Sequence, residues 1–271
     1  MKYSAVSQFL KEKENKRGDI LIILEDVFKI RREDLVLYPQ KELSIEQSEK
    51  LKDLVTRLEN DEPVQYIIGK WEFCGRIYSV GEGVLIPRED TLAVIELAAL
   101  HTPKQDAVFA DLGSGSGCIA ATLSLKYGLK GYAVERSEKA FKYLKENIEG
   151  LAIEAILGDM FEENTLSKLP PLDLVISNPP YITGEEMKKL DKEVLKEPFE
   201  ALFGGEDGLE YYRKIIAVYR DKLKKGGVLA FELGFKQADS VIELFRQNGF
   251  EEIYEQKDLS GIRRAVCAIK K

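Results

Sequence analysis

The four residues Asn178-Pro179-Pro180-Tyr181 have the types and order suited to holding an amino group in place. They follow an apolar run over residues 172–177 that is typical of a buried parallel strand, and the carboxyl end of such a strand faces the crevice where α/β sheets bind ligands. Pro179 keeps Asn178 extended, and consecutive prolines give a stiff turn without backbone N–H groups. We therefore expect two fixed acceptors, the Asn178 side-chain oxygen and the Pro179 carbonyl, beside the Tyr181 ring. Such a corner suits a planar NH2 group whose nitrogen attacks a second molecule.

A glycine-rich turn upstream indicates where that second molecule binds. An apolar strand over residues 108–112 runs into glycines at the alternate positions 113, 115 and 117, and a helix follows. Alternate glycines let a backbone approach a ligand closely. Cys118 stands where the G-x-G-x-x-G fingerprint of dinucleotide sites has its third glycine. Asp111 at the strand end favours a cationic ligand, such as an amino acid carrying a sulfonium, over a pyrophosphate.

Two further carboxylates end the next two predicted strands. Glu135 follows Gly113 by roughly 20 residues, the distance at which an acidic residue binds ribose hydroxyls. Asp159 follows a strand near 153–158 and could accept a hydrogen bond from an adenine amino group. Acidic strand ends together with a glycine turn indicate S-adenosylmethionine rather than NAD. The cofactor-binding residues that we predict are Asp111, Gly113, Ser114, Gly115, Ser116, Gly117, Glu135, Asp159, Met160 and Asn178.

Together these residues resemble those of the class I methyltransferases that use S-adenosylmethionine to methylate amino or amide nitrogen. Narrower motifs resemble the HemK/PrmC family, and the resemblance covers nearly the whole chain, most densely from residue 63 onward. These motifs are Pro63-Val64-Gln65-Tyr66-Ile67-Ile68-Gly69, Trp71-Glu72-Phe73, Val84-Leu85-Ile86-Pro87-Arg88, Glu197-Pro198, the run from Ala201 to Leu209, and Lys257-Asp258-Leu259-Ser260-Gly261.

The family resemblance implies a reaction and a substrate. Enzymes of this family methylate the glutamine of the Gly-Gly-Gln motif in peptide chain release factors, so the resemblance implies transfer of a methyl group from S-adenosylmethionine to the N5 atom of that glutamine. S-adenosylhomocysteine is the product, and the role is in translation termination. The implied catalytic residues are Asn178, Pro179 and Tyr181, and the implied substrate-binding residues are these three with Pro180. A ribosomal protein glutamine and an adenine amino group of nucleic acid remain as alternative substrates, because enzymes acting on them share the tetrapeptide.

Composition narrows the class of partner. The chain has 271 residues, is 44% hydrophobic and carries a net charge of −7 with a pI of 5.2. Proteins that bind nucleic acid are usually basic over the contact surface, so the negative net charge favours a protein substrate. The spacing of the three cysteines suggests neither a disulfide nor a metal site. Without a signal-type or membrane-spanning apolar run, we expect a cytoplasmic protein with no membrane partner. We assign no catalytic role to His101, Arg88 or Glu197.

The residue pattern predicts an α/β chain in three parts. Residues 1–70 should form a small helical bundle that docks the substrate, with apolar stripes at Ile20, Ile23, Leu24 and Val27 and at Leu51, Leu54, Val55 and Leu58, and a capping box at Ser44. Residues 71–87 should form a β-hairpin linker. Residues 88–271 should form the S-adenosylmethionine-dependent methyltransferase domain, a Rossmann-like doubly wound seven-stranded sheet. Its strands are expected near 107–112, 131–135, 153–158, 172–177, 228–232, 251–257 and 264–270, with helices over 91–100, 207–224 and 236–248.

The same family resemblance implies that the last strand is inserted antiparallel. The charged run 185–196 is interpreted as the solvated face of a helix.

Overall fold

A computed structural model describes residues 1–103, 106–258 and 260–271, and the chain forms two compact units. The first unit contains Met1–Lys70 together with the short segment Asp191–Lys196. The second contains Trp71–Leu190 and Glu197–Lys271. Each unit has its own apolar core, so each can be described by itself.

The first unit is a bundle of short helices: α1 (Tyr3–Glu12), α2 (Arg17–Phe28), α3 (Arg32–Leu37), α4 (Ile45–Glu59) and α5 (Val64–Ile68), with a 3₁₀ turn over Glu14–Lys16. The predicted stripe on α4 is buried, and α2 buries all of its stripe except Val27, which is only partly covered. The capping box at the start of α4 is confirmed, since Gln47 N donates to Ser44 Oγ at 3.0 Å and Ser44 N donates to Gln47 Oε1 at 2.9 Å. These contacts fix where α4 begins.

A short hairpin opens the second unit. Its strands are β1 (Lys70–Phe73) and β2 (Arg76–Ser79), joined by a two-residue turn in which Cys74 has φ +51° and Gly75 has φ +77°. A turn with both central residues at positive φ matches the twist of paired strands. The strands end at residue 79, and residues 80–88 continue as an extended loop that buries Val80, Val84 and Ile86.

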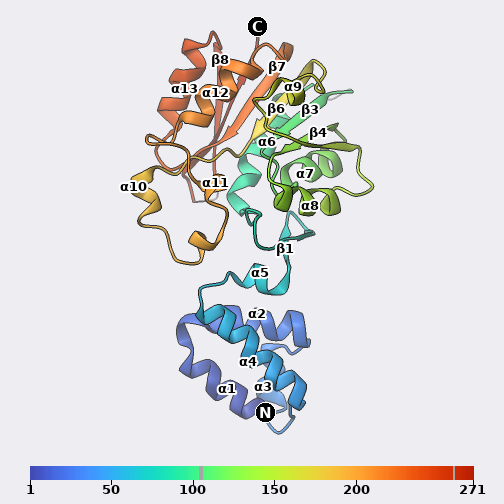
Figure 1. Cartoon of the computed structure of the whole chain (residues 1–271), viewed down its shortest axis with the longest axis vertical. Helices are drawn as coiled ribbons and strands as arrows, with labels where there is room; N and C mark the ends of the chain where they lie inside the picture. Colours follow the sequence, from blue (N-terminus) through green and yellow to red (C-terminus); the bar gives the residue numbers. More distant parts are fainter. Residues whose placement is uncertain (104–105, 259) are drawn as a thin grey trace. The chain divides into compact units, whose positions relative to one another are not determined.

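A seven-stranded sheet dominates the second unit (Figure 1). Its strands are β3 (Val108–Leu112), β4 (Lys130–Glu135), β5 (Ile153–Leu157), β6 (Leu172–Ser177), β7 (Leu223–Glu232), β8 (Glu252–Lys257) and β9 (Arg263–Ile269). The spatial order is β5-β4-β3-β6-β7-β9-β8. The pairs from β5 to β7 are parallel, whereas β9 runs antiparallel to both β7 and β8. The expected sheet with an inserted antiparallel last strand is confirmed.

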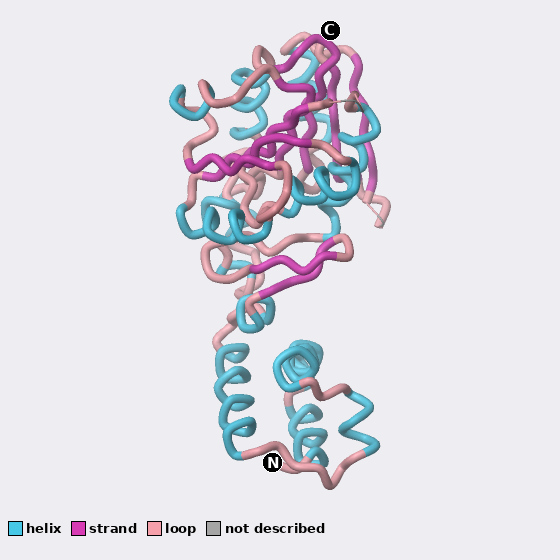
Figure 2. The backbone as a smooth tube through the Cα atoms, turned by 90° about the vertical axis from the view of Figure 1, so that its right-hand side faces the viewer, coloured by secondary structure: helices cyan, strands magenta, loops and turns pink. Residues whose placement is uncertain are grey.

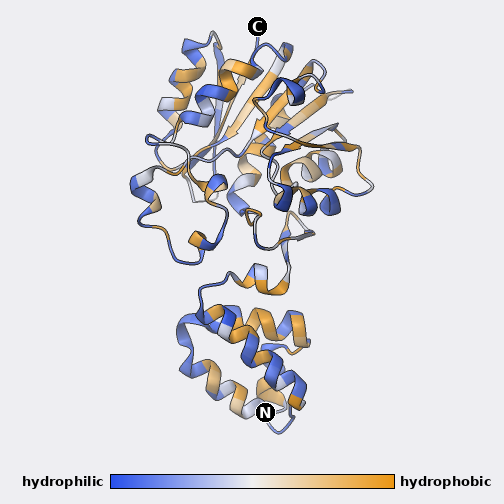
Figure 3. Ribbon diagram, viewed as in Figure 1, coloured by the Kyte–Doolittle hydropathy of each residue, from blue (hydrophilic) through white to orange (hydrophobic). Residues whose placement is uncertain are grey.

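Helices cover both faces of this sheet, as Figures 1 and 2 show. One face packs against α6 (Leu92–His101), α7 (Cys118–Tyr127) and α8 (Glu138–Asn147), and the other against α12 (Glu210–Tyr219) and α13 (Ala238–Gln247). The interior strand β7 shows why: successive side chains point to opposite faces, so Val228 and Ala230 join the first core while Leu229 and Phe231 join the second. The stretches of strand that are buried on both faces are mainly apolar, and Figure 3 shows orange ribbon along the inner strands of the sheet.

Two expectations about element boundaries are wrong. The helix expected over 207–224 spans only Glu210–Tyr219, and β7 begins at Leu223 rather than at 228. Leu172 N donates to Lys222 O, so the ladder with β6 already starts there. Gly226 has φ +77°, a conformation that no α-helix continues through, and the β6–β7 register shifts next to it. Sheet pairing therefore overrides the local helical pattern.

The expectation of one helix over the charged run 185–196 is also wrong. Only α10 (Gly184–Met187) and a 3₁₀ turn over Val194–Lys196 are helical there, while α9 (Glu163–Leu166) and α11 (Phe199–Leu202) are equally short elements elsewhere. Its apolar residues Met187, Leu190, Val194 and Leu195 stand at helical spacing, but none of them is buried, so no core packing stabilises a longer helix there. Two charges of its second half pair with distant residues of the first unit, where Lys16 binds Glu193 and Lys192 Nζ lies 3.9 Å from Asp61 Oδ2.

Candidate active site

The carboxyl ends of the parallel strands bring the predicted site residues to one edge of the sheet. Asp111 is the penultimate residue of β3, Glu135 is the last of β4, and Asn178 directly follows β6. β3 is hydrogen-bonded to both β4 and β6. Ser177 Oγ donates to Leu112 O at 2.7 Å, which ties the end of β6 to the end of β3. The glycine turn and the Asn-Pro-Pro-Tyr corner therefore emerge side by side.

Asp111 is a buried carboxylate with one unused oxygen. Its side chain is fully covered, and Oδ2 accepts from Ala120 N of α7 at 3.2 Å. Oδ1 has no hydrogen-bond partner among the described residues. Burial raises the pKa of Asp111 to about 7, against the weaker opposing effect of the Ala120 hydrogen bond. A buried and unpaired carboxylate oxygen fits a cationic ligand group, which would remove the cost of its isolation.

The turn after β3 is shaped by glycines for two different reasons. Gly113 and Gly115 have φ +69° and +53°, and a Cβ at either would meet only ordinary van der Waals neighbours, so the backbone conformation is what demands glycine. Gly117 also has positive φ, but a Cβ there would lie 2.7 Å from Leu144 Cδ1. Gly117 thus lets α8 pack against the start of α7, and Ser116 is buried with its carbonyl accepting from Asn147 Nδ2 at 2.9 Å. A ligand could approach the turn most closely over Gly113 and Gly115.

The turn and β4 are joined through Glu135. Its Oε2 accepts from Gly115 N at 2.9 Å and its Oε1 accepts from Ser137 N at 2.7 Å, and the side chain is 7% exposed. Each carboxylate oxygen keeps a lone pair, because a carboxylate has about four acceptor sites. Glu135 is therefore held rigidly while remaining able to accept from a pair of hydroxyl groups.

Asp159 and Met160 lie beyond the end of β5. Asp159 Oδ1 accepts from Phe161 N at 2.9 Å, and Oδ2 lies 3.9 Å from Arg136 Nη1. Tyr219 OH donates to Met160 O at 2.7 Å, which holds this loop to α12. A Cβ at Gly113 would lie 3.5 Å from Met160 Cε, so the Met160 side chain lies against the glycine turn.

The Asn-Pro-Pro-Tyr corner is held by its tyrosine. Gln237 Nε2 donates to Tyr181 O at 3.0 Å, and Tyr181 OH donates to Glu232 Oε1 at 3.4 Å. Among the described residues, the Asn178 side chain and the Pro179 carbonyl have no hydrogen-bond partner. The two predicted acceptors are thus available, while the residue that ends the corner is fixed at both its backbone and its side chain.

Glycines let three segments pack closely against Tyr181. A Cβ at Gly204 would lie 2.5 Å from Tyr181 Cα, one at Gly208 would lie 2.4 Å from Tyr181 O, and one at Gly234 would lie 2.9 Å from Tyr181 Cδ2. Real Cβ atoms essentially never approach this closely, and glycine is required at Gly204 and Gly208 because the close atoms there include backbone, whereas at Gly234 a Cβ would have to displace the side chains of Tyr181 and Gln237. Sequence reasoning recognised Gly204 and Gly208 only as parts of a family motif and missed Gly234, Gln237 and Glu232 altogether. An acidic residue at a strand end was the available signal for Glu232, since the same pattern singled out Asp111 and Glu135.

Arg88 and Glu197, to which no role was assigned, form an ion pair. Glu197 is 5% exposed, and its Oε2 also accepts from Ile86 N at 3.0 Å. Burial raises the pKa of Glu197, against the effect of Arg88. The pair joins the loop after the hairpin to the segment that leads into α11. Leu259, part of another family motif, lies outside the described residues.

Other kinds of site find little support. In the described part of the chain, no group of three or more His, Cys, Asp or Glu side chains could hold a metal ion. None of the described helices combines the length and apolar character needed to cross a bilayer. The arrangement offers a glycine turn with fixed carboxylates for one ligand and two free carbonyl-type acceptors for another.

Known proteins resemble the chain in both units. The PrmC N-terminal domain family matches residues 3–69, and the methyltransferase small domain family matches residues 93–209. A methyltransferase structure from Pyrococcus furiosus has a TM-score of 0.57 at 17% identity and covers 81% of this chain and 98% of that one, which supports the fold alone.

Two curated relatives are more similar in sequence. A release factor glutamine methyltransferase from Bacillus cereus is 35% identical over 97% of this chain and 95% of that protein. One from Geobacter sulfurreducens is 37% identical over 95% of this chain and 92% of that protein. With such identity over nearly the full length of both proteins, this chain belongs to the release factor glutamine methyltransferase family.

Proposed function

We propose that this protein transfers a methyl group from S-adenosylmethionine to the side-chain amide nitrogen of the glutamine in the Gly-Gly-Gln motif of peptide chain release factors. The observation that carries the proposal is the stiff corner after β6, whose acceptors Asn178 and Pro179 are unpaired and stand beside the glycine turn after β3. Membership of the family supplies the substrate class.

The residues around the glycine turn fit S-adenosylmethionine. The unpaired Oδ1 of Asp111 suits the positively charged amino acid end, and the fixed carboxylate of Glu135 suits two ribose hydroxyls. Asp159 is available to an adenine amino group, and Met160 offers an apolar surface beside the turn. When bound, this cofactor supplies a methyl group on a sulfonium, a carbon that a weak nucleophile can attack.

The amide nitrogen needs help because its lone pair is delocalised into the carbonyl. Asn178 Oδ1 and Pro179 O would each accept one hydrogen of the amide NH2 group, so that the nitrogen is presented in one orientation. Fixing the reacting atom in this way is an entropic effect worth up to ~7–11 kcal/mol in favourable cases. The same two acceptors stabilise the positive charge that grows on nitrogen as the new bond forms, the counterpart of an oxyanion hole.

Tyr181 would complete this site with an aromatic face. A ring beside a developing cation attracts it through its π face, and a flat ring also packs on a flat amide. Asn178, Pro179, Pro180 and Tyr181 together would form the substrate-binding wall. No general base is required before transfer, because the methylated nitrogen can lose its proton to water afterwards.

The helical unit is proposed to dock the release factor away from the reacting glutamine. It exposes large apolar side chains at the end of α3, directly after it and at the start of α4: Val36, Leu37, Tyr38 and Ile45 are 55–81% exposed. Exposed apolar residues of this size mark surfaces that bind other proteins when they form a patch. The net charge of −7 agrees with a protein substrate rather than with nucleic acid.

The deciding experiment incubates the protein with cofactor labelled in its methyl group and with unmethylated release factor. We expect one methyl group on the Gly-Gly-Gln glutamine, located by mass spectrometry, and no label on a release factor whose motif glutamine is changed to alanine. Asn178→Ala should lower kcat by ~10²-fold, by analogy with loss of one oxyanion-hole group, while cofactor affinity changes little. Asn164→Ala, at an exposed asparagine on α9, is the matched control.

Three other outcomes would change the proposed substrate or the proposed role of Asn178. Label on a ribosomal protein glutamine alone would keep the mechanism and replace the substrate. Label in DNA or RNA alone would replace the amide by an adenine amine. Full turnover by Asn178→Ala would remove that residue from the mechanism.

A further inference from the structure

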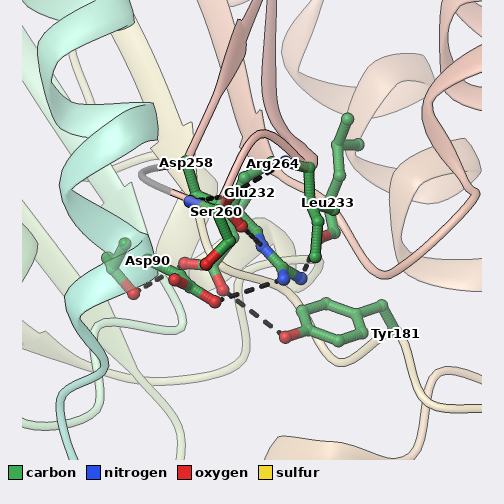
Figure 4. A network of polar contacts seen from close by, with 9 residues as sticks. Asp90, Tyr181, Glu232, Leu233, Asp258, Ser260 and Arg264 are labelled. Atoms are coloured by element: carbon green, nitrogen blue, oxygen red, sulfur yellow. Dashed lines mark hydrogen bonds and ion pairs between the residues drawn. The ribbon is translucent and has the colours of Figure 1, made fainter.

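A polar network lies at the carboxyl end of β7 and joins one proposed substrate-binding residue, Tyr181, to groups that are not proposed to touch the cofactor or the substrate amide (Figure 4). At its centre is Glu232, the last residue of β7, which is 1% exposed. Its Oε2 accepts from Thr91 Oγ1 at 2.6 Å, and its Oε1 accepts from Tyr181 OH at 3.4 Å. Burial raises the pKa of Glu232 to about 7. Burying a carboxyl group costs more free energy than burying an apolar side chain, so its presence here indicates a functional role.

The network fixes Tyr181 in one position. Tyr181 is held at its hydroxyl by Glu232 and at its carbonyl by Gln237, while Gly234 leaves no room beside the ring. Burial raises the pKa of Tyr181, so the phenol stays protonated and can donate. Figure 4 shows the Tyr181 hydroxyl directed at the Glu232 carboxyl group. The ring could not swing away without losing this hydrogen bond.

Arg264 of β9 secures the residues next to this hydrogen-bonded pair. Its Nη2 lies 3.2 Å from Asp90 Oδ2, its Nη1 donates to Leu233 O at 3.2 Å, and its Nε lies 3.2 Å from Asp258 Oδ2. Asp90 precedes Thr91 and Leu233 follows Glu232, so one guanidinium contacts a neighbour of each partner in the Thr91–Glu232 hydrogen bond. The side chains of Arg264 and Asp258 are only 13% and 4% exposed, which makes this ion pair less subject to screening than the one with Asp90, whose side chain is 47% exposed.

We propose that Glu232 is a positioning residue for methyl transfer: it orients the Tyr181 ring against the acceptor corner, and Arg264 holds Glu232 in place. This inference rests on the proposed function, because it gives Tyr181 a task at the reacting amide. Glu232 does not touch substrate or cofactor and acts through the tyrosine hydroxyl alone. Its effect must therefore disappear when that hydroxyl is removed.

A double-mutant cycle tests this dependence. The variants are Tyr181→Phe, Glu232→Met and the two combined, with Glu232→Gln as the conservative replacement that keeps an acceptor oxygen. At pH 8.5 and saturating cofactor we expect each single variant to lower kcat by about tenfold, the lower range for a hydrogen bond to a charged group. The combined variant should also lose about tenfold, whereas Glu232→Gln should stay within about threefold of the parent. The KM for the cofactor should change little.

Stability separates positioning from a structural role. At pH 8.5, Glu232→Met removes a buried charge whose cost offsets the loss of the hydrogen bonds from Thr91 and Tyr181, so the variant should melt close to the parent while it turns over more slowly. A combined loss near a hundredfold, an unchanged rate in either single variant, or a loss of rate matched by a loss of stability would overturn the inference. If the parent methylates some acceptor other than release factor glutamine, the proposed function fails, and the same cycle measured on that acceptor still tests Glu232.

Discussion

Replacing Asp111 by asparagine should stabilise the cofactor-free protein at alkaline pH, even though Asp111 belongs to the proposed cofactor site. The carboxyl group is fully buried, and its pKa rises from the ordinary 3.8 to about 7. A group whose folded-state pKa lies above its unfolded value contributes stability below the unfolded pKa, and that stability is lost as the pH rises through the folded pKa. The cost of charging Asp111 is therefore fully present above pH 7.

The magnitude follows from the size of the shift. Between pH 5.5 and pH 8.5 the folded form passes its pKa of about 7, so roughly 1.5 pH units of the penalty develop in that interval. At ~1.36 kcal/mol per unit this is about 2 kcal/mol. The difference in free energy of unfolding, Asp111→Asn minus parent, should thus rise by about 2 kcal/mol over this interval. Any constant cost of the asparagine amide cancels in this comparison.

The assay is thermal or urea unfolding of the cofactor-free protein at both pH values. Trp71, the only tryptophan, lies in the unit that contains the sheet, so its fluorescence reports on that unit. About 2 kcal/mol corresponds to a shift of ~4–8 °C in Tm for a unit of this size. Asp221→Asn, at an exposed aspartate, is the control.

Two results would contradict the reasoning on Asp111. An Asp111→Asn effect of equal size at pH 5.5 and pH 8.5 would mean that the buried carboxyl group is not strained by its charge. The second is an equal rise in Tm when S-adenosylmethionine is added to the parent and to Asp111→Asn. It would mean that the unpaired oxygen of Asp111 does not contact the positively charged group of the cofactor.

Two further outcomes are expected. Gly204→Ala should lower kcat by tenfold or more with cofactor affinity retained, because its Cβ would lie 2.5 Å from Tyr181 Cα and 2.6 Å from Pro180 O. The control Gly18→Ala, whose Cβ would have nothing within 4 Å, should leave kcat unchanged. Equal kinetics for the two variants would remove the packing argument. Leu37→Lys should raise the KM for release factor several-fold and leave kcat unchanged, since Leu37 is 67% exposed on the helical unit. The control Leu125→Lys, at a leucine on α7 that is 56% exposed, should leave the KM for release factor unchanged. Identical KM values for the two variants would place docking elsewhere.

The two most perturbed carboxyl groups of the site lie at the same edge of the sheet. Asp111 on β3 and Glu232 on β7 are both fully or almost fully buried, and burial raises the pKa of each to about 7. Neither contributes stability by being there, because both would be cheaper as neutral residues. Both lie at the ligand-binding edge of the sheet, where a functional role can outweigh the stability that a buried carboxyl group costs.

The sequence alone determined most of the sheet and the site residues that stand at strand ends. Apolar runs located the strands, and an acidic or amide residue after a run located Asp111, Glu135 and Asn178, because parallel strands end at a common edge. The glycine spacing located the turn after β3 for a similar reason, since positive φ is a local property that few other residues tolerate. Local signals failed at the start of β7, where strand pairing decided the outcome, and over residues 185–196, where the apolar residues of the expected helix are not buried.

Tertiary structure alone decided which distant residues share a contact. Tyr181 meets Glu232 across 51 positions and Arg88 meets Glu197 across 109, and no local pattern encodes either pair. Such contacts depend on the order of strands β3, β6, β7 and β9 and on loops that approach only where glycine leaves room. Whether a carboxyl oxygen is paired or left unpaired, as in Asp111, is likewise settled only when the whole chain packs around it, because hydrogen-bond partners come from elements far apart in sequence.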